Sequence, residues 1–452
     1  MHRSGAGLPA GAARSVSSAA LPPLAREIGR WAMVALMING IIGAGIFGLP
    51  SKVHALAGAS GLLAFAACAL IIGCIALCFA EVSSRFTGTG GPYLYALEAF
   101  GDLAGFLVGW VTWLARVTAL ATISNVMASY LAFFWPATGA GWGRAAAMAA
   151  VTATLTAINL VGVRQAAGSI GLLTIGKLTP LVLFVGVGLF FIDTRTFSLA
   201  GAPDAASFTQ AVLQLVFAFA GFEAVVVAAG ESRDPRRDLP FALFVGLATA
   251  TVLYILIQVV CIGTLPSLAA SERPLADASV CFAGAIGGSV ITVGALVSTI
   301  GVLCGVVLVA PRILYAMSER GQLPRALGLT HPRFHTPSVA ILVTAAVGLA
   351  LSISGTFSYL VNLNVIARLV TYASTAGALV VLRRSERDRP ALFSVPAGGL
   401  VASLCLGACA WLLVASGARG LRDMGIAIAC GLALFTFARR RTSTLPAAKS
   451  TG

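Results

Sequence analysis

The stretch that decides the fold lies near the N-terminus and reads Ile38-Asn39-Gly40-Ile41-Ile42-Gly43-Ala44-Gly45-Ile46-Phe47-Gly48-Leu49-Pro50. Four of its residues are glycines, and each glycine costs about 1 kcal/mol relative to alanine inside a helix. The stretch belongs to an apolar run that is long enough to cross a membrane as a helix. We therefore expect a helix that breaks in its middle, at membrane depth.

Part of this stretch also matches a nucleotide-binding motif. Residues 43–48 fit GxGxxG, the dinucleotide-binding fingerprint, which functions between a strand and a helix and is followed about 20 residues later by an acidic residue. No strand is predicted before residue 43, and no acidic residue follows at that distance. We reject nucleotide binding. Close helix packing through small residues is the other explanation of the glycines.

The composition excludes a soluble protein. Of the 452 residues, 58% are apolar and 10% are charged, whereas soluble domains contain about 25% charged residues. Long apolar runs are therefore unavoidable, and lipid is their natural solvent. The net charge of +14 does not indicate nucleic-acid binding, because the basic residues lie in short groups between apolar runs and not in one patch.

The nine cysteines and four histidines predict no disulfide framework and no metal site. The cysteines lie in or beside apolar segments without a CxxC pair, and the histidines lie near the N-terminus or near segment ends. We interpret the cysteines as small packing residues. Because no nucleophile–base pair is visible either, we expect no cofactor and no enzymatic activity.

Twelve apolar runs follow Arg30, each long enough to cross a bilayer as a helix. They do not alternate apolar with polar residues, so membrane strands are not expected. We predict an all-α integral membrane protein with twelve transmembrane helices, at about residues 31–57, 60–84, 101–134, 145–162, 168–192, 208–230, 239–263, 284–310, 337–354, 358–382, 397–417 and 421–438.

The distribution of basic residues predicts the orientation in the membrane. With a cytoplasmic N-terminus, 21 of the 30 Lys and Arg residues lie on the cytoplasmic side. This asymmetry follows the positive-inside rule, so both termini are predicted to be cytoplasmic, with a disordered tail at 1–29 and a second tail at 441–452. Six basic residues lie outside: Lys52, Arg144, Arg195, Arg273, Arg419 and Arg422.

Four charged residues are predicted at membrane depth: Arg116, Lys177, Arg368 and Glu223. Each costs about 2.5–3.5 kcal/mol at a helix centre and so needs a partner or a watery cavity. Glu223 is the only acid predicted at this depth, which leaves cationic residues in surplus. An anionic group of a substrate would offset part of that surplus.

A second broken helix is predicted in the sixth run, at Phe217-Ala218-Phe219-Ala220-Gly221-Phe222-Glu223. The two breaks fall in the first helices of two successive five-helix sets, residues 30–192 and 193–383. Since five is odd, the second set enters the membrane from the opposite side, which gives an inverted repeat with a transport site at the breaks. Two further helices, within residues 384–440, complete the membrane part.

The polarity of the half-helices predicts the chemistry of the ligand. The outer half of the first helix begins near Gly45 with free N–H groups, and its inner half ends near Ile41 with free carbonyls. The first half of the sixth helix also ends with carbonyls, around residues 217–220. Because N–H groups bind a carboxylate and carbonyls bind an ammonium, such a site suits an α-amino acid.

At these residues the chain resembles the amino acid–polyamine–organocation family of transporters, which have the leucine-transporter-type fold. The resemblance covers about residues 30–441 and rests on several motifs taken together. These are the stretch at residues 43–50, Gly88-Thr89-Gly90-Gly91-Pro92-Tyr93-Leu94-Tyr95, Gly221-Phe222-Glu223 with the charged segment at residues 231–240, and Arg312-Ile313-Leu314-Tyr315-Ala316-Met317.

The resemblance implies where a substrate binds. In the family the substrate carboxylate meets the loop of the first helix, its amine meets carbonyls of both broken helices, and an aromatic gate stands at the position of Phe217. Many relatives have Ser or Thr where this chain has Ala44, which lacks their hydroxyl. The expected substrate-binding residues are Ile41, Ile42, Gly43, Ala44, Gly45, Ile46, Arg116, Phe217, Ala220 and Glu223.

Three of the charged residues carry further expectations. Lys177 resembles a family lysine that occupies the sodium site of sodium-driven cousins, where it would hold the first helix against the eighth, near Ser298 and Thr299. Snorkelling to an interface is the alternative for Lys177. Glu223 either carries a coupled proton or forms a permanent ion pair with an arginine. Arg116 either binds an acidic substrate side chain, neutralises Glu223, or packs between helices.

These observations predict a secondary active transporter of the cell (inner) membrane that moves an amino acid by alternating access. It is expected to be sodium-independent and either proton-coupled or an exchanger. A polyamine or other organic-cation antiporter is the alternative within the family, and a channel is the alternative from another class. The expected partners are an amino acid, protons and the lipid bilayer, with no nucleic acid.

Overall fold

The computed structural model describes residues 28–86, 91–161, 170–197, 203–227, 232–385 and 391–443. Within these ranges the chain is helical and contains no β-strand. The predicted terminal tails, apart from residues 28–29 and 441–443, and residues 88–90 of the family motif lie outside the described ranges. The α-helices are α1 (Arg30–Ile41), α2 (Ala44–Ala57), α3 (Gly61–Ser83), α4 (Gly91–Phe100), α5 (Asp102–Leu131), α6 (Gly141–Val161), α7 (Ile170–Gly188), α8 (Ala205–Phe219), α9 (Glu223–Val227), α10 (Pro235–Thr264), α11 (Pro274–Glu319), α12 (Ser338–Ser354), α13 (Phe357–Ser385), α14 (Gly398–Ala415) and α15 (Ala418–Ser443).

Eight helices of the described chain are long and apolar enough to cross a membrane, if α2 and α3 are counted as one continuous segment. Four shorter apolar helices accompany them, at Arg30–Ile41, Gly176–Phe191, Ala205–Phe219 and Ser338–Ser354. The protein is therefore a multi-pass membrane protein, and every predicted run coincides with a helix or a pair of half-helices. The count of twelve spans remains a prediction.

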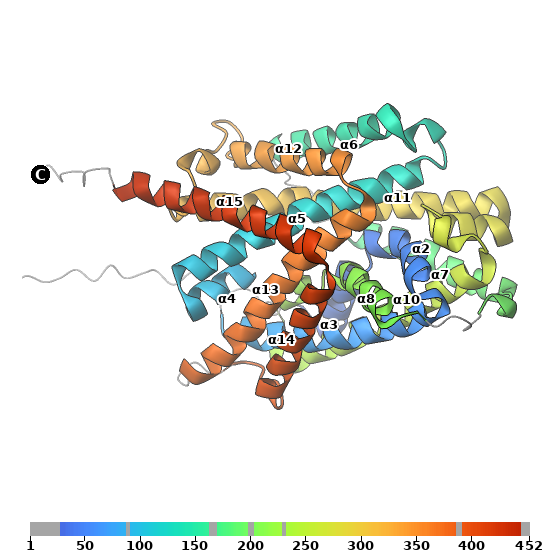
Figure 1. Cartoon of the computed structure of the whole chain (residues 1–452), viewed down its shortest axis with the longest axis horizontal. Helices are drawn as coiled ribbons and strands as arrows, with labels where there is room; N and C mark the ends of the chain where they lie inside the picture. Colours follow the sequence, from blue (N-terminus) through green and yellow to red (C-terminus); the bar gives the residue numbers. More distant parts are fainter. Residues whose placement is uncertain are drawn as a thin grey trace, which may run out of the picture.

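The helices pack around α5, which crosses the middle of the bundle and contacts α4, α11, α12 and α13 (Figure 1). On one side of it α6 and α12 lie next to each other, and on the other side α1 and α2 pack against α10 and α8. The largest apolar cluster includes buried side chains from both broken helices. Both broken helices are thus held inside the bundle, where a break can line an enclosed space.

Both predicted breaks are present. Helix α1 ends at Ile41. The next two residues, Ile42 and Gly43, are extended, and α2 begins at Ala44. Helix α8 ends at Phe219 and is followed by an extended Ala220. The chain continues into the short helix α9 only at Glu223.

The two breaks touch each other through glycine backbones. Gly221 has a φ of +112°, a conformation that favours glycine. A Cβ atom on Gly221 would lie 2.1 Å from the carbonyl oxygen of Gly40, so no side chain fits between the two segments. This contact fixes the spacing of the breaks.

Local signals define other helix ends. Asp204 caps α8, because its Oδ1 accepts a hydrogen bond from the Ser207 N–H at 2.8 Å. Hydrogen bonding by Ser207 lowers the pKa of the Asp204 carboxyl. Within α11, Gly284 has a φ of +62° and kinks the helix at the residue where the eighth apolar run was predicted to begin.

Candidate functional site

A cavity of about 620 Å³ lies between the two breaks. Five elements form most of its wall: the α1–α2 break, α5, α7, the α8–α9 break and α11. Arg368 of α13 completes it. The lining residues are Asn39, Gly40, Ile41, Gly43, Ala44, Gly45, Arg116, Ala119, Ile123, Lys177, Phe217, Ala220, Gly221, Glu223, Ala224, Val297, Ser298, Gly301, Val302, Gly305, Val306, Val309 and Arg368.

Most residues predicted for the site line this central cavity. Two do not: Ile42 and Ile46 are 1% and 0% exposed and belong to the apolar core. The carbonyl oxygen of Ile42 nevertheless accepts a hydrogen bond from Lys177. The N-terminus of α2, at Ala44 and Gly45, faces the cavity and has the N–H groups that a carboxylate would bind.

Lys177 is buried and bound to the end of α1. Its Nζ donates hydrogen bonds to the carbonyl oxygens of Asn39 at 2.5 Å and Ile42 at 2.7 Å. The ammonium therefore satisfies two carbonyls that the break leaves without helix partners. On α11, the Ser298 hydroxyl has no hydrogen-bond partner among the described residues, and the Thr299 hydroxyl donates to Ala295 of its own helix. Lys177 is anchored to α1 and does not snorkel.

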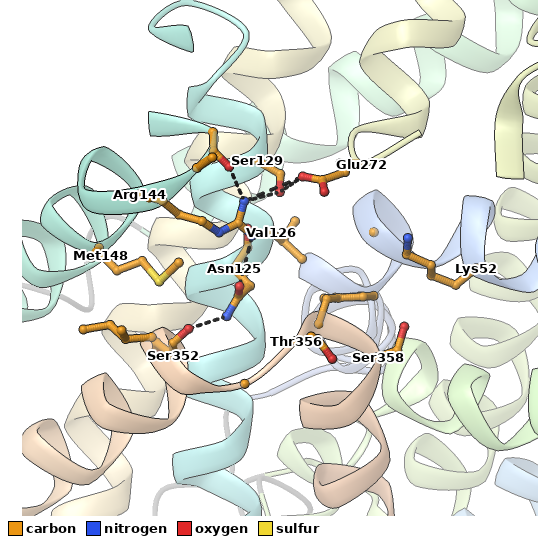
Figure 2. Close-up of a pocket in the computed structure, with 18 residues that line it drawn as sticks. Lys52, Asn125, Val126, Ser129, Arg144, Met148, Glu272, Ser352, Thr356 and Ser358 are labelled. Carbon is orange, nitrogen blue, oxygen red and sulfur yellow. Dashed lines mark hydrogen bonds and ion pairs between the residues drawn. The ribbon is translucent and has the colours of Figure 1, made fainter. Parts of the chain in front are cut away.

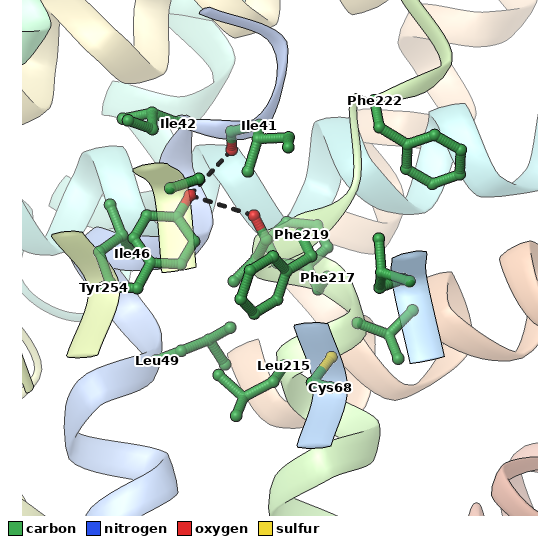
Figure 3. Packing of buried hydrophobic residues seen from close by; sticks show 14 of the residues in the cluster. Ile41, Ile42, Ile46, Leu49, Cys68, Leu215, Phe217, Phe219, Phe222 and Tyr254 are labelled. Carbon is green, nitrogen blue, oxygen red and sulfur yellow. Dashed lines mark hydrogen bonds between the residues drawn. The ribbon is translucent and has the colours of Figure 1, made fainter. Parts of the chain in front are cut away.

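Tyr254 of α10 lies against both broken helices (Figure 3). Its hydroxyl lies 2.9 Å from the Ile41 carbonyl oxygen and 3.2 Å from the Ala218 carbonyl oxygen. The Ile41 carbonyl was predicted to be free for a substrate amine, but it already faces this donor. The Ala218 carbonyl near the end of α8 shares this donor.

Glu223 forms an ion pair, and its partner is Arg368. The Arg368 Nη1 and the Tyr372 hydroxyl each donate to Glu223 Oε1 at 2.8 Å. The Gly221 N–H donates to Oε2, also at 2.8 Å. The direct partner of Glu223 is therefore Arg368 of α13. Arg116 of α5 makes no ion pair with Glu223, although its charge also attracts the carboxylate.

Arg368 is held in place by a second contact. Its Nε donates to Asn364 Oδ1 at 2.8 Å, and the Asn364 amide donates to the Ala115 carbonyl of α5 at 2.5 Å. The network therefore runs from α9 through α13 to α5. Arg368 is therefore fully engaged at the wall of the cavity.

Arg116 lies next to Ala115 in sequence, yet no hydrogen bond or ion pair holds its side chain among the residues that the structure describes. It lines the central cavity and also a second space of about 440 Å³, the α4 vestibule, which extends between α4, α5, α11 and α13. Arg116, Glu223, Val309 and Arg368 border both spaces. The two spaces therefore lie on either side of the same four side chains.

A third pocket, of about 540 Å³, shares no lining residue with the central cavity (Figure 2). Its wall contains Lys52 and Arg144, which were predicted to lie on the outer side. Arg144 is committed there: its guanidinium donates to Asn125 Oδ1 at 3.0 Å and pairs with Glu272 at 3.6 Å. In the described chain, the central cavity shares wall residues with the space at α4 and none with this pocket.

Two features were missed from the sequence. One is the α11 wall of the cavity, whose signal was the spacing of Ser298, Gly301 and Gly305 along one helix face. The other is Glu81 of α3, a fully buried acid inside the second predicted span. Glu223 is therefore not the only acid in the predicted spans. The signal for Glu81 was its position four residues before Arg85.

A helical membrane protein with a cavity between two broken helices has the architecture of a solute transporter. The comparisons with known proteins agree. A model of the amino acid permease family matches residues 28–434, so the chain belongs to that family, whose members are transporters and not enzymes.

Three relatives, all from Bacillus subtilis (strain 168), cover almost the whole chain. The serine/threonine exchanger SteT is 31% identical over 91% of this chain and 95% of its own length. The methylthioribose transporter is 29% identical over 93% of this chain and 95% of its own. The branched-chain amino acid permease BcaP is 26% identical over the same two shares. Similar sequences thus serve different substrates.

Proposed function

We propose that this protein carries an amino acid across the cell membrane by alternating access, without sodium, in a twelve-helix fold with a five-plus-five inverted repeat and cytoplasmic termini. The observation that carries the proposal is the cavity between the two breaks. The N–H groups at the start of α2 can bind a carboxylate, and carbonyls at the end of α8 can bind an ammonium. Two of the relatives are named for amino acid transport.

Sodium independence rests on Lys177. Its ammonium binds two carbonyl oxygens at the end of α1, the kind of oxygen ligand that a sodium ion would otherwise use. Because the Lys177 ammonium already supplies a positive charge to these oxygens, a sodium ion is not needed there. In this proposal Lys177 holds the α1 break in shape through the cycle.

The coupling mode is either exchange or proton cotransport. Exchange is supported by the serine/threonine exchanger, which is 31% identical. Proton coupling would use Glu223, but a proton can bind its carboxylate only if Arg368 and Tyr372 release it. An organic-cation substrate is disfavoured, because the cavity wall holds three cationic side chains and one acid that is already paired.

Counterflow in proteoliposomes tests the proposal. A panel of amino acids is first screened for thermal stabilisation of the purified protein, since a ligand that binds the folded state raises its melting temperature. Vesicles are then loaded with a stabilising amino acid, and uptake of the labelled compound is measured in sodium and in choline buffer of equal ionic strength. We expect equal uptake in the two buffers and stimulation by internal substrate. Flux without such stimulation would indicate a channel, and a strict sodium requirement would overturn the role of Lys177.

A further inference from the structure

The charges around the central cavity do not balance. Arg116, Lys177 and Arg368 are cationic, and Glu223 is the only acid among the lining residues. Arg368 is paired with Glu223, and Lys177 is bound to carbonyl oxygens of α1. The remaining guanidinium, that of Arg116, makes no hydrogen bond or ion pair in the described chain, and the one carboxylate that attracts it, Glu223, is already paired with Arg368.

The usual explanation for arginines in a membrane protein does not apply to Arg116. Arg312 and Arg320 of the α4 vestibule lie at the end of α11 that is predicted to be cytoplasmic, where basic residues are expected. Arg116 lies in the middle of α5, where a charge is costly unless water or a partner compensates for it. A protein retains such a residue most readily when a ligand supplies the compensating charge.

Arg116 also lies in the same cavity as the N–H groups that would bind the α-carboxylate of an amino acid. Gly43, Ala44 and Gly45, at the N-terminus of α2, line the same cavity. An amino acid whose α-carboxylate meets these N–H groups still has a side chain that must point to another part of the wall. A guanidinium offers a planar pair of donors, which a second carboxylate matches in a two-bond contact.

We propose that the substrate is an amino acid with an anionic side chain and that Arg116 is the residue that recognises this side chain. The inference rests on the proposed transport function and makes it more specific. Substrate of this charge would enter or leave through the α4 vestibule, whose wall contains Arg116, Arg312, Arg320 and Arg368 against the one acid Glu223. A space lined mainly by one sign of charge concentrates solutes of the opposite sign.

The test compares acidic amino acids with their amides, which have nearly the same shape. Counterflow of L-glutamate and L-aspartate is measured against L-glutamine and L-asparagine in proteoliposomes, in choline buffer, for the wild type and for Arg116→Gln. We expect the wild type to prefer the acids by roughly tenfold or more, and Arg116→Gln to lose roughly 10- to 100-fold for the acids with little change for the amides.

Two further variants keep the result interpretable. Arg195→Gln removes one positive charge from an exposed 3-10 helix, Thr194–Thr196, which lines neither the central cavity nor the α4 vestibule, and it should keep the wild-type preference. Arg116→Lys keeps the charge without the planar fork, so it should retain part of the preference. If Arg116→Gln does not fold, the wild-type ratio of acid to amide counterflow and the same ratio for Arg116→Lys still test the inference.

The outcomes separate the two levels of the argument. Equal or better counterflow of the amides in the wild type would overturn the inference while leaving amino acid transport intact. The same holds if Arg116→Gln slows acids and amides equally, which would indicate that Arg116 exchanges places with Arg368 at Glu223 during the cycle. Absence of counterflow with every amino acid, acidic or neutral, would instead overturn the proposed function itself.

Discussion

Two glutamates inside the bundle pair with arginines of the same helix, α13, but their surroundings differ. Glu81 of α3 pairs with Arg383 and its side chain is 0% exposed. Glu223 of α9 pairs with Arg368 and its side chain is 14% exposed, at the wall of the central cavity. The first pair is closed to solvent on the side of the acid, whereas the second can be reached by water and by a ligand.

The donors around each acid reinforce this difference. Glu81 accepts from Arg383 Nε at 2.7 Å, from the Val395 N–H at 2.8 Å and from Arg85 Nη2 at 3.1 Å, so it ties α3 and α13 to the segment before α14. Glu223 is bound by the Gly221 N–H of the break and by Arg368 and Tyr372 of α13, which face the cavity region. The comparison teaches that the same ion-pair chemistry serves as a fixed joint at one place and as part of an accessible site at the other.

Breaking the closed pair should have the largest effect on stability. In Glu81→Gln two arginines lose their carboxylate, and removal of one partner from a buried pair costs about 3–5 kcal/mol of unfolding free energy. The melting temperature of the purified protein measures this loss. Glu319→Gln, which changes an exposed acid at the end of α11, is the matched control and should change stability by less than about 0.5 kcal/mol. A normal melting temperature for Glu81→Gln would show that the joint is not needed.

Breaking the accessible pair should cost less stability and more function. In Glu223→Gln the amide can still accept one hydrogen bond, and water in the cavity can solvate Arg368, so we expect a loss of about 1–3 kcal/mol. If a proton travels with the substrate, uptake by the wild type should rise at acidic outside pH, and this variant should flatten the dependence. Melting temperature and pH-dependent uptake are measured on the same preparation. Wild-type behaviour in both would leave Glu223 without a role.

Removing the unpaired cation should have the smallest effect on stability. Arg116 makes no hydrogen bond or ion pair in the described chain, so Arg116→Gln removes only a longer-range attraction to Glu223. We expect the unfolding free energy to fall by no more than about 1 kcal/mol, or to rise, and the melting temperature measures this change. A loss of transport in Arg116→Gln would therefore report on substrate binding and not on stability, whereas both glutamate variants are expected to lower stability. A fall as large as that of Glu81→Gln would mean that Arg116 has a structural partner.

Local chemistry explains which parts of the site could be predicted from the sequence. The breaks at Ile42–Gly43 and after Phe219 follow from glycines and small residues within an apolar run, and the depth of Lys177 follows from its position in such a run. The partner of Glu223 does not follow, because it depends on how α13 is rotated against α5. Arg368 lies 145 residues from Glu223 along the chain, and Arg116 was an equally good partner by charge alone.

Packing also limits how the site can be tested. The glycine-rich sequence suggests Gly45→Leu as a variant that blocks binding without unfolding the protein. The structure disagrees, since a Cβ atom on Gly45 would lie 2.6 Å from the Ala218 Cα of α8. That substitution would force the two broken helices apart. A blocking side chain has to come from a glycine that lines the cavity and has room beside it.

Gly305 of α11 meets this condition, and the measurement on it tests the central claim most directly. It lines the central cavity and has nothing within 4 Å of an added Cβ, so Gly305→Leu adds an apolar side chain at the cavity wall without a clash at its Cβ. Gly407→Leu makes the same change at an exposed position of α14 with equal room and serves as the control. Both proteins are purified, their melting temperatures are compared, and amino acid counterflow is recorded in proteoliposomes. The account predicts that both melt like the wild type, that Gly305→Leu loses counterflow, and that Gly407→Leu keeps it. Counterflow at the wild-type rate in Gly305→Leu would contradict the placement of the transport site between the two broken helices.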